Sequence, residues 1–309
     1  AVSAVAWLAV AARSEAEEWL PFPSPGGAVL VHRDCVHHVE DSFHVETGLE
    51  RGDILRRGAQ LEALPPCPHA PRRPNATAAL GYYSDWAAYT QFSHSAGFGY
   101  MASDWRVPAA PRSTGPLPGL SSSYLFNGLE NSGGHEGTAS FILQPVLSYG
   151  KSGCIVNPLN FFQWHLISFL VTDAGRAYCG ARLSVQEGEP VRGVMRLAED
   201  GQTWTVESTR LSNNQTSTYT ARLSAKADTA YLTLETMINY SCKAFPASGS
   251  VTFSRNILKD TAGHSVDAAW LKKIPHTECR QKVQLGDDGA VTIAWDAGAS
   301  GPESVPLVV

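Results

Sequence analysis

The sequence predicts an all-β fold, a two-sheet antiparallel β-sandwich of the jelly-roll type. From Trp86 onward, short apolar segments recur about every 8 to 15 residues and are separated by clusters of Gly, Pro, Asn and Ser. Hydrophobic positions with helical spacing are scarce in this region. Asp200-Gly201 lies between two of the apolar segments, and this dipeptide is typical of a tight β-hairpin. Together these observations favour packed sheets over helices.

The expected strands are runs of apolar, β-branched or aromatic residues bounded by turn-forming residues. They cover residues 87–92, 99–107, 122–129, 140–149, 161–172, 177–185, 190–197, 203–208, 216–224, 230–238, 251–258 and 290–295. No repeat of fixed period connects them.

One main domain with flanking segments is expected from 309 residues. Residues 81–298 form the predicted sandwich, and residues 299–309 form a C-terminal tail. Residues 17–80 are interrupted by eight prolines, which predicts an extended N-terminal arm or pro-segment. Within the arm we expect strands at 28–31 and 39–45 and a short helix at 51–64.

The N-terminal residues indicate secretion. Residues 1–12 form an uncharged apolar run that is too short to span a bilayer, and a charged segment follows it. We interpret residues 1–16 as the remnant of a secretory signal peptide, with a short retained helix as the alternative. Three sequons, at Asn75, Asn214 and Asn239, are usable only in a secretory lumen and predict a glycoprotein.

Six cysteines, an even number, point to disulfides in an oxidising, extracellular setting. Six cysteines allow 15 pairings, and the sequence does not choose among them. Cys154 with Cys179 is the preferred pair, because these residues flank one predicted strand pair. Several buried free thiols are the alternative.

Composition excludes two classes of partner. The net charge is −5, only 17% of residues are charged, and there is no basic run that would attract phosphates. We therefore expect no nucleic-acid partner. No segment reaches the length of a transmembrane helix, so we also expect no membrane span.

Two apolar strands each carry one lone polar residue. Gln144 lies within residues 141–147, and Glu235 lies within residues 230–237. A polar group buried in such a strand needs a partner. Strand parity puts Glu235 on the face opposite Leu232 and Leu234, so it points outward if the leucines face the core. Both faces of the strand around Gln144 are apolar, and parity does not decide its direction.

A series of short motifs resembles a known family. The phrases FNGLE at 126–130, ILQPVLSYG at 142–150 and CKAFPASGSVTF at 242–253 flank a Trp-containing strand and a strand that carries Leu-Glu. From Trp86 to Leu258 this order is similar to the secreted glutamic peptidases (eqolisins) and their uncharacterised fungal and protist relatives. The resemblance implies a concanavalin-like β-sandwich.

The resemblance also implies a site and an activity. It implies a catalytic dyad of Glu235 and Gln144 in an acid-active endopeptidase that acts on polypeptides and needs no metal or other cofactor. In such a pair the Glu acts as general acid and base, and the Gln amide stabilises the oxyanion. The residues that would shape the substrate cleft are Phe126, Glu130, Trp164, Tyr124 and Phe169.

The chain departs from the family pattern at several positions. Phe126 and Glu130 stand where the family has Trp and Asp, and Pro145, which cannot donate a backbone hydrogen bond, follows Gln144. The rival hypothesis is a non-catalytic sandwich protein, either a lectin-like module that binds glycans or an extracellular structural or assembly component.

The predicted arm contains histidines that could act as metal ligands. The motif His32-x-x-Cys35-x-His37-His38 contains donor residues, but its spacing does not match a zinc finger and Cys35 is expected to be oxidised. The sequence therefore predicts no metal site.

Overall fold

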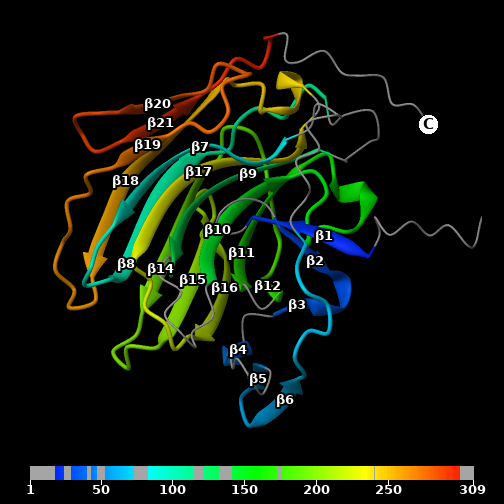
Figure 1. Ribbon diagram of the computed structural model, residues 1–309, viewed down its shortest axis with the longest axis vertical. Helices are drawn as coiled ribbons and strands as arrows, with labels where there is room; N and C mark the ends of the chain where they lie inside the picture. Colours follow the sequence, from blue (N-terminus) through cyan, green and yellow to red (C-terminus); the bar gives the residue numbers. More distant parts are fainter. Residues whose placement is uncertain are drawn as a thin grey trace, which may run out of the picture.

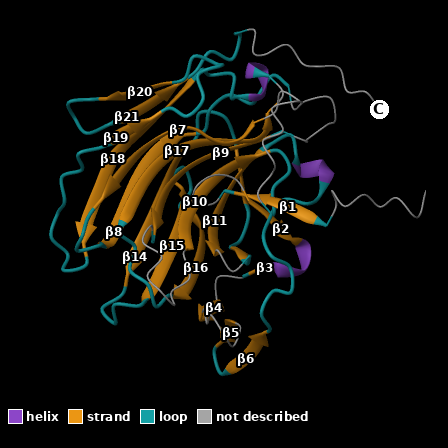
Figure 2. Ribbon diagram, viewed as in Figure 1, coloured by secondary structure: helices purple, strands orange, loops and turns teal. Residues whose placement is uncertain are grey.

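The computed structural model describes residues 18–23, 29–39, 43–46, 53–72, 83–113, 121–131, 141–172, 175–239 and 241–299 (Figure 1). Within these ranges the chain is built from strands, with three 3-10 turns at Arg33–Cys35, Pro158–Asn160 and Cys242–Ala244 (Figure 2). The predicted signal remnant at 1–16, the sequon at Asn75 and the tail beyond residue 299 lie outside the described residues.

One sheet contains nine of the described strands and is antiparallel except at one edge, where β12 and β3 pair in parallel. Its order is β19 (Leu271–Lys273), β7 (Tyr83–Ser93), β17 (Thr229–Asn239), β9 (Ser122–Glu130), β10 (Phe141–Tyr149), β11 (Trp164–Thr172), β12 (Ala177–Cys179) and β3 (Val36–His38), with β13 (Leu183–Val185) also paired to β11.

The second sheet contains ten of the described strands. Its order is β20 (Lys282–Leu285), β21 (Val291–Ala294), β18 (Ser250–Asp260), β8 (Phe98–Arg106), β14 (Pro190–Leu197), β15 (Thr203–Arg210), β16 (Gln215–Arg222), β4 (Phe43–Glu46), β5 (Asp53–Arg57) and β6 (Gln60–Leu64). β14 and β15 form the predicted hairpin, in which Gly201 has φ 68° and Asp200 Oδ1 accepts from the backbone N–H of Thr203 at 2.8 Å.

The two sheets pack face to face, and the prediction of an all-β sandwich is confirmed. A buried cluster between them includes Leu125, Leu143 and Leu232 from the nine-stranded sheet and Met195 and Val206 from the ten-stranded sheet. Alternate residues of β9, β10 and β17 belong to this cluster, as the period of two in a strand requires. Burial of this apolar surface is the main stabilising contribution to the sandwich.

The face of the nine-stranded sheet that is turned away from the other sheet, called here the outer face, is also covered. β1 (Trp19–Phe22) and β2 (Val29–His32) pair antiparallel, and this N-terminal hairpin packs on the outer face in a second apolar cluster. The ring of Phe22 meets that of Phe169 at 5.7 Å, and the Tyr124 hydroxyl donates to the carbonyl of Pro21 at 3.4 Å. The hairpin therefore lies over the middle of this sheet.

Other parts of the arm belong to the two sheets. β3 extends the nine-stranded sheet, and β4, β5 and β6 extend the ten-stranded one. The predicted helix at 51–64 is wrong, because this segment forms the β5–β6 hairpin with Gly58 at φ 59° in its turn. Pairing with β4 overrides the helical propensity of its Leu, Arg, Glu and Ala residues.

All six cysteines are paired, as Cys35–Cys67, Cys154–Cys179 and Cys242–Cys279. The preferred pair Cys154–Cys179 is thus confirmed, and the alternative of buried free thiols is wrong. Three disulfides are compatible with an oxidising, extracellular compartment.

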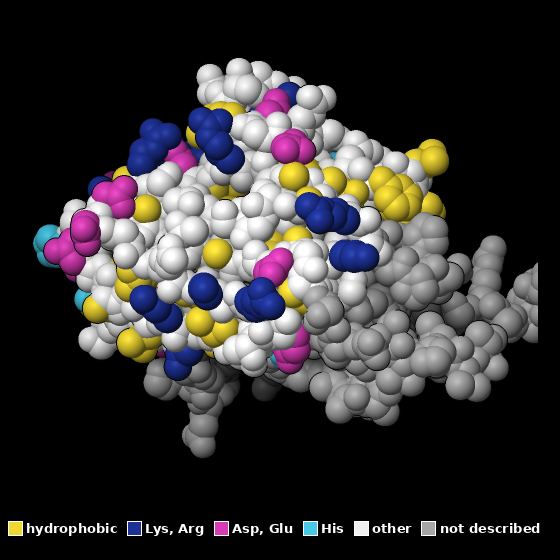
Figure 3. Space-filling model, turned by 90° about the horizontal axis from the view of Figure 1, so that it is seen from above, with side chains coloured by type: hydrophobic (Ala, Val, Ile, Leu, Met, Phe, Trp, Pro, Cys, Tyr) yellow, Lys and Arg dark blue, Asp and Glu magenta, His cyan; other side chains and the backbone are white. Residues whose placement is uncertain are grey.

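Two surface features bear on partners. Among the described residues, no helix has the length and apolarity needed to cross a membrane. On the face drawn in Figure 3, Lys and Arg side chains are interspersed with Asp and Glu side chains and do not form one continuous basic patch.

Candidate functional site

Three adjacent strands place a group of polar residues on the outer face. Leu143 pairs with Leu129 and Val146 with Phe126, so Gln144 on β10 lies opposite Gly128 on β9. On its other side, Gly128 pairs with Tyr231 on β17. Gly128 therefore lies between Gln144 and Tyr231, and the side chains of Ile142 and Phe126 lie 3.3 and 3.5 Å from the position that a Cβ on Gly128 would occupy.

Glu130 completes this group. It lies two residues beyond Gly128 on β9 and pairs with Ile142 of β10, which makes Gln144 its diagonal neighbour. Diagonal neighbours across an antiparallel pair have Cα atoms about 7 to 8 Å apart, within reach of long side chains. A carboxyl group and a carboxamide thus share one side of the sheet beside Gly128.

Gln144 is fully buried, and within the described residues neither Oε1 nor Nε2 of its amide has a hydrogen-bond partner. A buried polar group without a partner costs about 1 to 3 kcal/mol, so such groups are rare unless water, a ligand or a reaction uses them. The backbone of Gln144 is held between two strands, because Gln144 on β10 pairs directly with Phe169 on β11 and lies opposite Gly128 on β9. The amide is therefore fixed in position with its hydrogen-bonding capacity unused.

Glu130 is the acidic member of the group and is only 7% exposed. Burial raises the pKa of its carboxyl group to about 7, a hydrogen bond from the Tyr231 hydroxyl acts in the opposite direction, and the charge of Asp228 adds to the rise. Glu130 Oε2 has no hydrogen-bond partner among the described residues. The carboxyl group can therefore gain or lose a proton near neutral pH.

Aromatic rings surround one side of this group. The Trp86 ring contacts the rings of Phe126, Tyr231 and Tyr89 at centroid distances of 5.8, 4.7 and 4.9 Å. All of these contacts are edge-to-face, the arrangement that aromatic quadrupoles favour. The rings exclude water and strengthen electrostatic interactions beside Glu130.

The strand register does not bring Gln144 and Glu235 together. Glu235 pairs with Tyr124, and Tyr124 pairs with Ser148, four residues along β10 from Gln144. From strand geometry this separates the two residues by about 13 Å along the strands and roughly 9.5 Å across them. Both residues are fully buried.

Glu235 instead belongs to a separate part of the outer face. Its leucine neighbours Leu232 and Leu234 lie in the core between the sheets, so it points outward as strand parity predicts. Burial raises the pKa of the Tyr124 hydroxyl, and the charge of Glu235 raises it further. Tyr124 in turn donates to Pro21 of the N-terminal hairpin.

The expected cleft residues divide between the two faces of the sheet. Phe126, Tyr124 and Phe169 lie in the outer-face cluster with the N-terminal hairpin. Trp164 lies in the core between the sheets, where its ring meets Tyr149 at 5.2 Å. It therefore does not join the other expected cleft residues.

One of the three sequons, that at Asn214, lies wholly within the described residues, and the sequon at Asn239 does so except for Tyr240. Asn214 is exposed, with φ 57°, in the turn between β15 and β16, where a glycan has room. Asn239 is the last residue of β17.

The hydrogen bond between Tyr231 and Glu130 was not predicted from the sequence. The available signal was parity, because Tyr231 and Glu235 lie on the same face of one strand. Glu130 was expected only to shape a cleft, and its raised pKa depends on the burial that the strand pairing creates.

Three surface hollows are lined by described residues. One of 490 Å³ includes Asp104 and Arg255, one of 600 Å³ includes Tyr100 and Trp204, and one of 530 Å³ includes Leu20. Their linings do not include Gln144, Glu130 or Glu235. The three side chains are themselves buried, with Gln144 and Glu235 at 0% and Glu130 at 7% exposure.

Comparison with known proteins gives fold neighbours only. No protein-family model and no curated protein sequence matches the chain. Among solved structures, scytalido-glutamic peptidase with a peptide-based transition-state analogue is similar at a TM-score of 0.47 and 12% identity, over 69% of this chain and 99% of that one. SCP-B, an eqolisin peptidase in complex with the tripeptide Ala-Ile-His, is similar at a TM-score of 0.45 and 12% identity over the same shares of both chains. With TM-scores this low, these similarities do not decide the function of this chain.

Proposed function

We propose that the protein is a latent, secreted hydrolase of peptidase type in which Glu130 and Gln144 form the reactive acid and amide pair. The observation that carries this proposal is the pair of buried, incompletely hydrogen-bonded groups that lie diagonally across β9 and β10 beside Gly128. The polypeptide substrate class rests on the resemblance of the motifs at 126–130 and 142–150 to glutamic peptidases.

The chemistry requires both groups. With a peptide carbonyl over Gly128, the ionised Glu130 removes a proton from water, which attacks the carbonyl carbon. The Gln144 Nε2–H donates to the oxyanion of the tetrahedral intermediate. Glu130 then returns the proton to the leaving amine as the C–N bond breaks. Tyr231, which donates to the Glu130 carboxylate, orients it during these steps.

The raised pKa of Glu130 sets the expected pH range. A carboxyl group with a pKa of about 7 is protonated in strong acid and becomes a base only as the pH approaches neutrality. The rate should therefore rise with pH as this carboxyl group loses its proton, and because opening the site reduces its burial, the midpoint should lie between 4.5 and about 7. This range is higher than the strongly acidic range that the family resemblance implies.

The site must open before it can act. The N-terminal hairpin contacts Phe169, the direct neighbour of Gln144, and Tyr124. The hairpin extends neither of the two sheets. Removal of residues 1–32 deletes this hairpin and leaves β3 to β6 and the Cys35–Cys67 disulfide in place.

The test compares the full chain with the chain that starts at Arg33. Both are incubated with a denatured polypeptide between pH 3 and 8, and new amino termini are counted. The shortened chain should cleave the substrate and the full chain should not. Within the shortened chain, Glu130→Gln and Gln144→Ala should each lower the rate by about 100- to 1,000-fold, the range found when one oxyanion donor is removed.

Glu235→Gln is the matched control, because Glu235 is an equally buried acid on the same face. Its rate should stay within a few-fold of the parent. Loss of cleavage in Glu235→Gln with full activity in Glu130→Gln would contradict our assignment and restore the pair of Glu235 and Gln144.

A non-catalytic role is the second candidate, and the burial of the site favours it. In that case the sandwich binds a glycan or another extracellular component. Absence of cleavage by the shortened chain at every pH, together with reproducible hits on a glycan array, would establish this role.

A further inference from the structure

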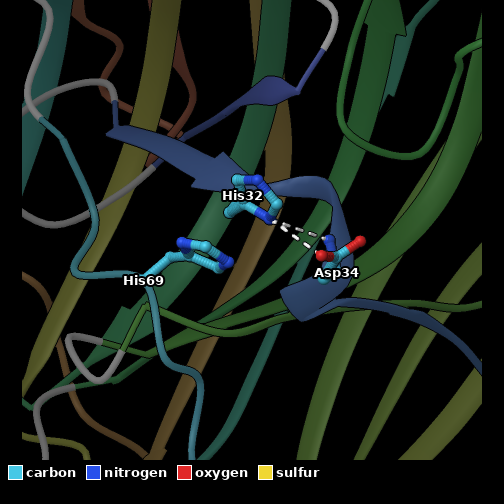
Figure 4. Close-up of side chains that lie close together, drawn as sticks. All are labelled: His32, Asp34 and His69. Carbon is cyan, nitrogen blue, oxygen red and sulfur yellow. Dashed lines mark hydrogen bonds and ion pairs between the residues drawn. The ribbon is translucent and has the colours of Figure 1, made fainter. Parts of the chain in front are cut away.

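Three side chains that could ligate a metal meet at one end of the N-terminal hairpin. His32 is the last residue of β2, Asp34 lies in the 3-10 turn that follows, and His69 lies in the segment after β6. Figure 4 shows the two imidazole rings side by side, with Asp34 next to His32. His69 is distant from the other two in sequence, so the motif at 32–38 gave no indication of this group.

The geometry is close to that of a metal site. One ligand atom from each residue can be chosen so that all three lie within 4.8 Å of one another. His32 Nδ1 is 3.4 Å from Asp34 Oδ2, and the rings of His32 and His69 stack with centroids 3.6 Å apart. Tetrahedral zinc with bonds near 2.0 Å needs ligand atoms about 3.3 Å apart. The two rings lie nearly parallel, with an interplanar angle of 24°, so one imidazole must turn out of the stack as the ligand atoms close from within 4.8 Å to this spacing.

The backbone around these residues is held from two sides. The disulfide Cys35–Cys67 lies three residues after His32 and two residues before His69, with its Cα atoms 5.6 Å apart. On the other side, Leu30 and Arg72 exchange two backbone hydrogen bonds of 2.7 and 3.0 Å. The segments that carry His32 and His69 are therefore fixed to each other, which reduces the entropy lost when a metal binds.

The surroundings of His32 leave Nδ1 on the ligand side. Its Nε2 lies 3.9 Å from the Glu18 carboxylate, the outer partner that metal-binding imidazoles commonly have. Nδ1 accepts only a long hydrogen bond of 3.3 Å from the backbone N–H of Asp34. The ring is 8% exposed, whereas Asp34 is exposed and gives an ion access.

The charges nearby also suit a cation. The carboxylates of Glu18 and Asp34 both face His32. Two arginines are also near: Arg33 lies between His32 and Asp34 in sequence, and the Arg72 guanidinium lies over the Trp19 ring at 3.9 Å, a ring whose centroid is 5.3 Å from that of His32.

We propose that His32, Asp34 and His69 bind one divalent transition metal ion, Zn²⁺ by preference, with the fourth position open to water. Two imidazoles and one carboxylate are a ligand set that zinc accepts, whereas Mg²⁺ and Ca²⁺ prefer oxygen ligands throughout. The bound ion links the N-terminal hairpin to residues 65–72 in addition to the disulfide. This site is separate from Glu130 and Gln144 and does not depend on their role.

The direct test is titration of the purified full chain with Zn²⁺ alone, by calorimetry and by competition with a chromogenic chelator. One ion should bind with a Kd on the order of 10 μM or tighter. His32→Ala and His69→Ala should each weaken binding by at least about tenfold, because each removes a direct ligand. The Co²⁺ form should show the visible absorption of tetrahedral cobalt, and each variant should lose it.

His264→Ala is the matched control, because His264 also pairs with a carboxylate, that of Asp260 at 3.1 Å, but has no third ligand. It should bind Zn²⁺ like the parent. Near-ultraviolet circular dichroism confirms that each variant is folded. No saturable Zn²⁺ binding by the parent chain would overturn the proposal, and so would parent-like binding by both His32→Ala and His69→Ala.

Discussion

The two faces of the nine-stranded sheet bury the same kinds of polar group in different ways. On the inner face, the Asn127 amide donates to the carbonyl of Gly193 in the facing sheet at 3.2 Å. On the outer face, the amide of Gln144 has no partner within the described residues, although it lies on the next strand. The inner amide connects two layers through Nδ2 and leaves only Oδ1 without a partner among the described residues, whereas neither polar atom of the outer amide has one.

Two of the buried carboxyl groups, those of Asp53 and Glu130, show the same contrast. Asp53 connects the sheets: its carboxylate contacts Arg176 Nη1 at 2.6 Å and accepts from the Tyr178 hydroxyl. Glu130 on the outer face has one carboxylate oxygen without a partner and a pKa raised to about 7. Under the proposed function, the inner polar groups stabilise the fold, while the outer ones keep a reactive state at the expense of stability.

The largest expected effect concerns the inner carboxylate. Asp53→Ala leaves Arg176, which is 4% exposed, with an uncompensated buried charge. The free energy of unfolding should fall by about 3 to 5 kcal/mol in urea denaturation. Glu46→Ala is the control, since its pair with Arg56 is partly exposed and should contribute less than about 1 kcal/mol. Equal losses in the two variants would remove the contrast between the faces.

A second test addresses the link between the outer face and the sheet edge. The disulfide Cys154–Cys179 closes a separation of 25 residues, and both cysteines belong to the outer-face cluster. Replacing both by Ser should lower the free energy of unfolding by about 3 kcal/mol, because the unfolded chain gains conformational freedom. A loss below about 1 kcal/mol would mean that packing alone holds this face.

The pH dependence of stability tests Glu130. Its pKa is about 7 in the folded protein against 4.5 for the free group, so the folded state binds the extra proton between these values. The corresponding stabilisation is complete below pH 4.5 and is lost as the pH rises through 7, by about 3 kcal/mol in total. Glu130→Gln should abolish this part of the profile, measured as the difference between the two denaturation curves.

Other groups change stability with pH in the opposite direction. The effect of Glu130 must therefore be measured as the difference between the parent and the Glu130→Gln variant. Burial lowers the pKa of His165 to about 4, so its contribution to stability grows as the pH rises through 4 to 6.5. A Glu130→Gln profile parallel to that of the parent between pH 4.5 and 7 would contradict the raised pKa of Glu130.

Much of the fold was predictable, because strand patterning is local. The alternation in residues 230–237 correctly placed Leu232 and Leu234 in the core and Glu235 on the outer face. Asp200-Gly201 identified its hairpin, since the dipeptide itself sets the turn. The helix predicted at 51–64 failed because the pairing of β5 with β4 depends on residues outside the segment.

The site was harder to predict, because strand parity assigns a face but not a register. Gln144 and Glu235 lie on the same face, yet register places Tyr231 beside Gly128 and leaves Glu235 four positions away from Gln144. The raised pKa of Glu130 requires knowledge of its burial, and the meeting of His32 with His69 requires the Cys35–Cys67 pairing, one of 15 that the sequence allows.

The central claim is that the amide of Gln144 on the outer face is kept for chemistry. The smallest expected change in stability tests this claim most directly. Gln144→Met and Asn127→Leu replace the two amides by apolar side chains of similar size, and urea denaturation at pH 5 compares their free energies of unfolding. Gln144→Met should be more stable than the parent by about 1 to 2 kcal/mol, since it removes a buried amide without partners. Asn127→Leu should be less stable by about 1 kcal/mol, since it loses the bond to Gly193. A destabilised Gln144→Met would contradict the claim that the outer-face amide is kept for chemistry.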